Sequence, residues 1–268
     1  MILPESAWTL SGAGTLAGLH VGAVAALWPH TRPTSLYTTS AGSIVGACIA
    51  TGKQPSEMHQ IVTGADYARL IPIDWLEAPL RGYAASTRNV IAWLRDLTRD
   101  QVLGDCEIPL TCITSDLWTG RATTFSTAAN PDMPIWQAVL ASMSIPDVFP
   151  IFERRYVDGG VMCNLGVPYL PKTGRRLGLR VVEANRIGPV TGWIDEQERL
   201  IEMMLSASES ELVMLGKVQD VPIIDLPGGN LGFLNRGMTA AQKEGLYQTG
   251  YETAQAWIES PAGKEWLA

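Results

Sequence analysis

The hydrophobic residues of the first sixty positions fall into blocks separated by glycine, proline and polar residues. Residues 7–11 form a short apolar run that leads into the glycine loop 12–15, and residues 16–28 have the length and composition of a buried helix. Residues 34–39 form a second apolar run, which predicts a second strand. Strand, helix and strand in this order predict a right-handed βαβ unit with parallel strands and helices on both faces of the sheet.

The same kind of pattern continues to the end of the chain. Further strands are predicted at 108–115, 122–126, 152–157, 177–183 and 222–226. Further helices are predicted at 44–51, 55–63, 86–98, 135–142, 193–215 and 239–258. The apolar connection 70–76 is interpreted either as a lid or as a packed loop. With no repeat or linker in its 268 residues, the chain is predicted to form a single α/β domain over residues 1–268.

Composition narrows the range of partners. Hydrophobic residues make up 46% of the chain and charged residues 18%, a balance that suggests a large core or an apolar cleft for an apolar ligand. The net charge of −7 and the pI near 5.0 argue against nucleic acid, which is bound through clustered Lys and Arg.

The cysteines and the N-terminal residues bear on the compartment. Cys48, Cys106, Cys112 and Cys163 form no C-x-x-C pair, which fits free thiols in a reducing compartment. The N-terminus lacks a signal-peptide pattern, and the apolar run 16–28 is too short to span a bilayer. A cytoplasmic location is expected, with signal-less export left open.

Ser40 stands where a nucleophile would be expected. It follows the apolar run Leu36–Thr39 and precedes a helix-like run, and small residues surround it. A serine on such a tight strand-to-helix turn projects its hydroxyl from the carboxyl edge of the sheet. The alternative interpretation is a simple turn in which the serine caps the helix.

The glycine loop allows two chemistries. Gly12-x-Gly14-x-x-Ala17 between a strand and a helix satisfies the loose dinucleotide fingerprint. That fold also needs an acidic residue about twenty positions later, and the chain has no Asp or Glu between Glu5 and Glu57. The same free amides can instead stabilise the oxyanion of an acyl-transfer intermediate, and a serine after the next strand favours this interpretation.

A catalytic serine needs a base, and the histidines do not supply one in the usual order. The chain has only His20, His30 and His59, so no histidine follows residue 59, and no carboxylate beyond it can form the Ser, Asp, His order of α/β-hydrolases. The base is therefore expected to be a carboxylate. Asp158 is the best placed, because it follows a predicted strand and precedes two glycines, although an Asp-Gly turn explains it equally simply. Without a catalytic imidazole, the pH profile is expected to lack an inflection near pH 6.5.

Several blocks, in order and at plausible spacing, resemble those of patatin-like phospholipases. They are Leu10–Gly14, Thr39–Gly42, Ser144–Pro150 and Tyr156–Gly160, with weaker likeness at Pro109–Ser126 and Glu244–Ala254. The resemblance covers nearly the whole chain, and the blocks together are far more specific than any one alone.

The resemblance implies a three-layer α/β/α fold with a mostly parallel sheet and a Ser40–Asp158 dyad without histidine. It also implies an oxyanion hole from backbone amides, here those of Gly12, Ala13, Gly14 and Ala41. The implied activity is hydrolysis of acyl esters of lipids through an acyl-enzyme, with no metal or cofactor. The partners expected are a lipid or fatty-acyl ester substrate and a transient membrane or micelle surface, with oligomeric state left open. A catalytically weak lipid-binding protein of the same fold is the alternative, and a dinucleotide-dependent oxidoreductase is a weaker one.

Three residues depart from the family pattern. Thr38 stands where the family usually has glycine, and it is expected to hold the turn differently or to narrow the site. Ala13 replaces a usual glycine, and Leu16 replaces a usual basic residue. A backbone amide remains at each position, so we expect these changes to affect rate and substrate preference more than mechanism.

Overall fold

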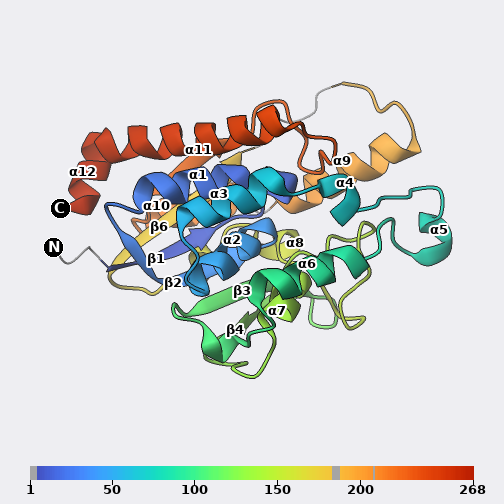
Figure 1. The fold of residues 1–268 in the computed structure, drawn as a ribbon, viewed down its shortest axis with the longest axis horizontal. Coiled ribbons are helices and arrows are strands. Elements are labelled where there is room, and N and C mark those ends of the chain that lie inside the picture. Colours follow the sequence, from blue (N-terminus) through green and yellow to red (C-terminus); the bar gives the residue numbers. More distant parts are fainter. Residues whose placement is uncertain (1–4, 183–187, 208) are drawn as a thin grey trace.

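A mixed sheet forms the middle layer of the protein (Figure 1). The computed structural model describes residues 5–182, 188–207 and 209–268. The strands are β1 (Glu5–Leu10), β2 (Arg32–Thr39), β3 (Leu110–Asp116), β4 (Arg121–Ser126), β5 (Tyr156–Asp158), β6 (Arg175–Val182) and β7 (Ile223–Pro227). Their order is β4-β3-β2-β1-β6-β7, with β5 paired to β3. Strands β4 and β5 run antiparallel to β3, and the other pairs are parallel.

Helices cover both faces of this sheet. They are α1 (Gly18–Leu27), α2 (Ala41–Ala50), α3 (Pro55–Gly64), α4 (Tyr67–Leu70), α5 (Ala78–Arg81), α6 (Arg88–Thr98), α7 (Ile135–Ser142), α8 (Gly160–Cys163), α9 (Trp193–Ser206), α10 (Glu209–Val218), α11 (Ala240–Glu259) and α12 (Pro261–Leu267). Short 3-10 turns lie at Gly14–Leu16, Leu103–Asp105 and Val167–Tyr169.

Alternate residues of the central strands enter two different cores, as the two-residue period of a strand requires. Leu36 of β2 and Cys112 of β3 belong to the main core, which residues of α1, α2 and α7 complete. Ile113 of β3 packs instead with Cys163 of α8 and Leu212 of α10. The α/β fold with helices on both faces is therefore as the sequence predicts.

Helix α11 packs closely along α1 (Figure 1). A Cβ atom added at Gly22 of α1 would lie 1.9 Å from the Tyr247 carbonyl oxygen, and one at Gly250 of α11 would lie 2.1 Å from the Leu19 carbonyl oxygen. Glycine at these two positions allows the helix backbones to approach, so α11 fixes the position of α1, the helix that follows the glycine loop.

Most predicted elements are confirmed within a few residues, and two predictions are wrong. The strand predicted at 152–157 is limited to Tyr156–Asp158, because Phe152 and Tyr156 form an isolated antiparallel bridge in which the chain folds back on itself. The single helix predicted at 193–215 is two helices, α9 and α10. The last residue of the strand predicted at 177–183, Glu183, lies outside the described residues.

In the part of the chain that the structure describes, the helices are either too short or too polar to cross a lipid bilayer.

Candidate active site

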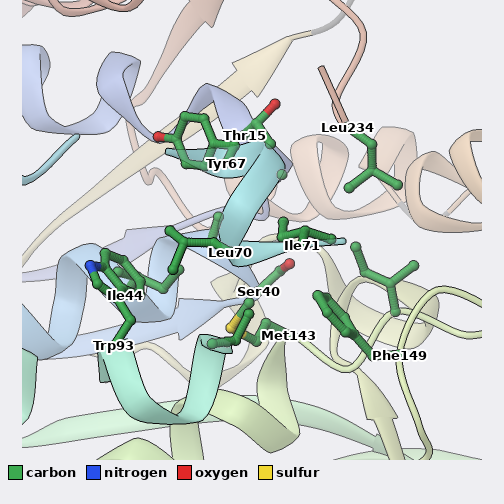
Figure 2. Close-up of a pocket in the computed structure, with 14 residues that line it drawn as sticks. Thr15, Ser40, Ile44, Tyr67, Leu70, Ile71, Trp93, Met143, Phe149 and Leu234 are labelled. Carbon is green, nitrogen blue, oxygen red and sulfur yellow. The ribbon is translucent and has the colours of Figure 1, made fainter. Parts of the chain in front are cut away.

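Ser40 occupies a strained turn between β2 and α2. Its backbone has φ 51° and ψ −127°, a conformation that costs a non-glycine residue free energy and is often found at functional positions. A Cβ atom at Gly42 would lie 2.4 Å from the Ser11 carbonyl oxygen, so a glycine is needed two residues after Ser40. The side chain of Ser40 is almost fully buried, and its hydroxyl points into a pocket (Figure 2).

Thr38 does not narrow this pocket, which was one of the two effects expected from the sequence. Its side chain is fully buried and is absent from the pocket lining. It packs instead on α2, where a Cβ atom added at Gly46 would lie 2.6 Å from Thr38 Cγ2. Gly46 therefore makes room for the threonine that replaces the usual glycine of the turn.

A chain of buried hydroxyl groups supports the turn from beneath. Thr38 Oγ1 donates to Ser43 Oγ at 3.0 Å, and Ser43 Oγ lies 2.9 Å from Ser142 Oγ. Ser142 Oγ donates to the Ile113 carbonyl oxygen at 2.6 Å and accepts the backbone N–H of Ser40 at 2.9 Å. Because the one proton of Ser142 goes to a carbonyl, Ser43 must donate to Ser142. The chain thus holds the amide of the strained residue in place.

Ser142 was not identified from the sequence. It ends the predicted helix 135–142, where a serine is unremarkable, and its contact with Ser40 joins residues about a hundred positions apart. No local pattern encodes such a contact.

Sheet register brings Asp158 to the serine. Strand β2 pairs with β3 up to Thr39, which lies opposite Ile113. Strand β5 pairs with the residues of β3 that follow, and Asp158 lies opposite Thr114. The carboxylate therefore lies directly beyond the end of the strand that carries Ser40. A Cβ atom at Gly159 would lie 2.3 Å from the Ile113 carbonyl oxygen, so this close approach requires glycine after Asp158.

The Asp158 carboxylate is fully buried. Oδ1 accepts the Gly160 N–H at 2.7 Å, whereas Oδ2 makes no hydrogen bond of standard geometry to any described residue. Burial raises the pKa of Asp158 to about 7, and the nearby Ser40 hydroxyl and the Gly160 N–H counteract part of that rise. A buried carboxylate without a cationic partner and with a pKa close to neutrality can accept and return a proton.

The glycine loop lies against the serine, since a Cβ atom at Gly12 would be 3.3 Å from Ser40 Cβ. The Gly12 N–H donates to Asn164, to both its carbonyl oxygen and Oδ1 at 3.2 Å. The Gly12 amide is therefore already hydrogen-bonded, although it was expected to be one of the four donors of the oxyanion hole. The N–H groups of Ala13, Gly14 and Ala41 have no partner among the described residues.

His20 lies beneath the glycine loop and has no hydrogen bond to Ser40. It is fully buried, and its Nε2 lies 2.9 Å from the carbonyl oxygen of Ser11, the residue before the loop. Burial lowers the pKa of His20 to about 4, so the ring is neutral at neutral pH and Nε2 carries the proton that the carbonyl accepts. His59 lies at the surface and pairs with Glu244 of α11.

The pocket beside Ser40 is lined mainly by apolar side chains from α2, α4, α6 and the segments around residues 143–149 and 234 (Figure 2). Its empty space amounts to about 520 Å³, open solvent at the mouth included. The lining residues are Gly14, Thr15, Ser40, Ala41, Ile44, Tyr67, Leu70, Ile71, Val90, Trp93, Met143, Ile145, Phe149 and Leu234. Leu70 and Ile71 of the predicted lid or packed loop thus contribute to its wall.

Residues 5–182, 188–207 and 209–268 contain no cluster of three or more His, Cys, Asp or Glu side chains that could hold a metal ion. The four cysteines are free thiols, and Cys48, Cys112 and Cys163 are buried.

Comparison with known proteins places this chain in a family. A family model described as patatin-like phospholipase matches residues 9–171. YqhO of Bacillus subtilis (strain 168), an uncharacterized protein, is 26% identical over 253 residues, covering 82% of this chain and 86% of YqhO.

Two solved structures share the fold at low sequence identity. VipD from Legionella pneumophila has a TM-score of 0.62 and 13% identity, with 96% of this chain and 67% of the VipD chain covered. A chain of the heterodimeric ExoU–SpcU complex from the type III secretion system of Pseudomonas aeruginosa has a TM-score of 0.55 and 18% identity, with 96% and 52% covered. Because the family model covers more than half of the sequence, this chain belongs to the patatin-like phospholipase family of lipid hydrolases.

Proposed function

We propose that this protein cleaves carboxylic esters of lipids, with Ser40 as nucleophile and Asp158 as the base. The observation that carries the proposal is a strained serine whose hydroxyl enters an apolar pocket beside a buried carboxylate with a free oxygen. An apolar pocket suits a fatty-acyl group, and the serine at its floor suits attack on the ester carbonyl.

The reaction proceeds in two steps. Asp158 takes the Ser40 proton as Oγ bonds to the ester carbonyl carbon, and it returns that proton to the leaving alcohol as the carbon–oxygen bond of the ester breaks. Water then attacks the carbonyl carbon of the acyl-enzyme and gives a proton to Asp158, which returns it to Ser40 Oγ as the bond between that oxygen and the carbonyl carbon breaks and the fatty acid is released. Each proton accepted is returned, so the dyad ends each cycle as it began.

The negative charge of the tetrahedral intermediate needs preorganised donors. The amides of Ala13, Gly14 and Ala41 are the candidates, since they have no partner among the described residues and flank Ser40. The Gly12 amide serves a different purpose in this proposal, because Asn164 holds it and so fixes the start of the loop.

Two observations bear on the alternatives. A buried carboxylate with a raised pKa serves no purpose in a lipid-binding protein without catalysis. Thr38, the departure from the family pattern nearest to Ser40, packs against Gly46 and does not enter the pocket. A dinucleotide needs donors for its phosphates and acceptors for its ribose hydroxyls, whereas this pocket offers few polar side chains.

Labelling with a fluorophosphonate followed by mass spectrometry tests the proposal. The label is expected on Ser40, and Ser40→Ala should abolish both labelling and the hydrolysis of medium-chain p-nitrophenyl esters. Ser43→Ala is the control for the site of labelling, because Ser43 is also buried but does not line the pocket, so this variant should still be labelled on Ser40 even if loss of the Ser43–Ser142 hydrogen bond slows turnover. Chelators should leave turnover unchanged. A label on Ser43, or full turnover by folded Ser40→Ala, would disprove the assignment.

A further inference from the structure

Two side chains separate the pocket from a second hollow in the protein. Leu70 of α4 and Trp93 of α6 line the pocket beside Ser40, and both also line a groove on the outer side of α3, α4 and α6. The groove has a volume of about 970 Å³ counted to its open mouth. The wall between the two spaces is therefore made of side chains that lie between two helices.

The outer groove is lined by both apolar and polar side chains. Ile61 and Ala92 contribute apolar surface in addition to Leu70 and Trp93, and the polar lining residues Gln60, Asp66, Arg69 and Asn89 are exposed. Asn89 Nδ2 donates to the Arg69 carbonyl oxygen at 2.7 Å, which ties α6 to α4 beside the wall. A hydrocarbon chain that passed the wall would meet apolar surface with water above it.

Trp93 closes one end of the inner pocket. Ile44 lines the same pocket, and Figure 2 shows the indole nitrogen of Trp93 turned away from Ser40. Ile44 lies four residues after Ser40 on α2, so it is one helical turn from the nucleophile on the same side of the helix. This end of the pocket therefore runs along α2 from the reacting serine to the tryptophan.

The closed end suits the acyl part of an ester. The alcohol must leave for water while the acyl group stays bonded to Ser40, so the group that occupies a closed end is the one that stays. We infer that Leu70 and Trp93 set the upper limit of the acyl-chain length that this enzyme accepts. This inference rests on the proposed function and identifies its substrates as esters whose acyl chains end at Trp93.

Trp93→Ala tests the inference by joining the pocket to the outer groove. The measurement is the ratio of kcat/KM for p-nitrophenyl palmitate to that for p-nitrophenyl butyrate, both in detergent-dispersed form. Each additional methylene of the acyl chain that the opened channel buries should raise kcat/KM roughly fourfold. The ratio is expected to rise by at least about tenfold in Trp93→Ala and by less in Leu70→Ala, because a leucine leaves a smaller opening.

Two further variants control the test. Trp136→Ala removes another partly buried tryptophan of the main core that lines neither space, and its ratio should match that of the wild type. Ala92→Trp, added to Trp93→Ala, refills the groove and should return the ratio toward the wild-type value.

The inference is overturned if Trp93→Ala and Leu70→Ala are folded, hydrolyse butyrate through Ser40 and keep the wild-type ratio. Failure of the proposed function looks different, since turnover of butyrate would then survive Ser40→Ala. Leu70→Ala carries the test alone if Trp93→Ala does not fold.

Discussion

Asp116 and Asp158 end two paired strands, yet their carboxylates have opposite electrostatic surroundings. Asp116 is the last residue of β3 and Asp158 the last of β5, and side-chain exposure is only 3% and 0%. Arg155 donates to Asp116 through Nε at 3.0 Å and Nη2 at 2.6 Å. This bidentate pair, more than any other contact, lowers the pKa of Asp116 to about 2.

Asp158 has no such cation. Its hydrogen-bonding contributions come from a backbone N–H and a serine hydroxyl, and burial raises its pKa to about 7. Both residues have little exposed surface, yet their pKa values move in opposite directions, because the hydrogen bonds from Arg155 dominate at Asp116 and desolvation dominates at Asp158, which has no cation beside it. The first is a permanent anion that holds a turn, and the second is suited to exchange a proton with Ser40.

The largest expected effect separates the two residues by turnover. Asp158→Asn keeps the size and much of the hydrogen bonding of the side chain but removes the proton acceptor, so kcat should fall by about 10²–10⁴-fold with little change in KM. Asp116→Asn should change kcat by only a few-fold, because Asp116 lies outside the pocket lining. Near wild-type turnover by Asp158→Asn would refute the dyad.

The second effect is on stability and has opposite signs at the two sites. The pKa of Asp158 is higher in the folded protein than its ordinary 3.8, so the folded state binds the proton more tightly and the free energy of unfolding falls as pH rises from about 4 to about 7. Asp158→Asn should remove this fall and add on the order of 1–3 kcal/mol to the free energy of unfolding at pH 8.

The pKa of Asp116 is lowered, so its contribution to stability is present above about pH 4 and is lost as pH falls toward 2. Asp116→Asn should remove the loss of stability below about pH 4 and leave the pH dependence of stability between about pH 4 and 7 unchanged. Urea unfolding between pH 2 and 8 measures the free energy of unfolding over both ranges, and equal pH profiles for the two variants would contradict the assigned shifts.

The smallest effects are expected from the histidines. The expectation of no inflection near pH 6.5 changes with the structure, since burial moves the carboxylate of Asp158 itself to about 7. kcat/KM should therefore rise with pH through about 7, and this inflection should persist in His30→Gln and His59→Gln.

His20 needs separate treatment because it is buried against the loop. His20→Ala should lower the melting temperature, since it leaves a cavity and a Ser11 carbonyl without its donor. His20→Gln, which keeps a donor, should be milder and should also retain the inflection. Loss of the inflection in any folded histidine variant would assign it to imidazole instead of Asp158.

The sequence by itself determined the order of the elements, the serine turn and the positions of the three histidines. These are local or compositional properties: strand and helix periods are visible in short windows, and the position of three histidines is read directly from the chain. The family blocks added Asp158 and the glycine loop. The fold class and the family followed from the same residues.

Tertiary structure decided the properties that depend on residues far apart in the chain. The register along β3 places Asp158 beyond Thr39, burial raises its pKa, Ser142 holds the Ser40 amide, and Asn164 occupies the Gly12 amide. The wall of Leu70 and Trp93 likewise exists only because α4 packs beside α6. The local sequence shows which face of a helix or strand is apolar, whereas the burial and the hydrogen-bond partners of a residue depend on which distant elements pack against that face.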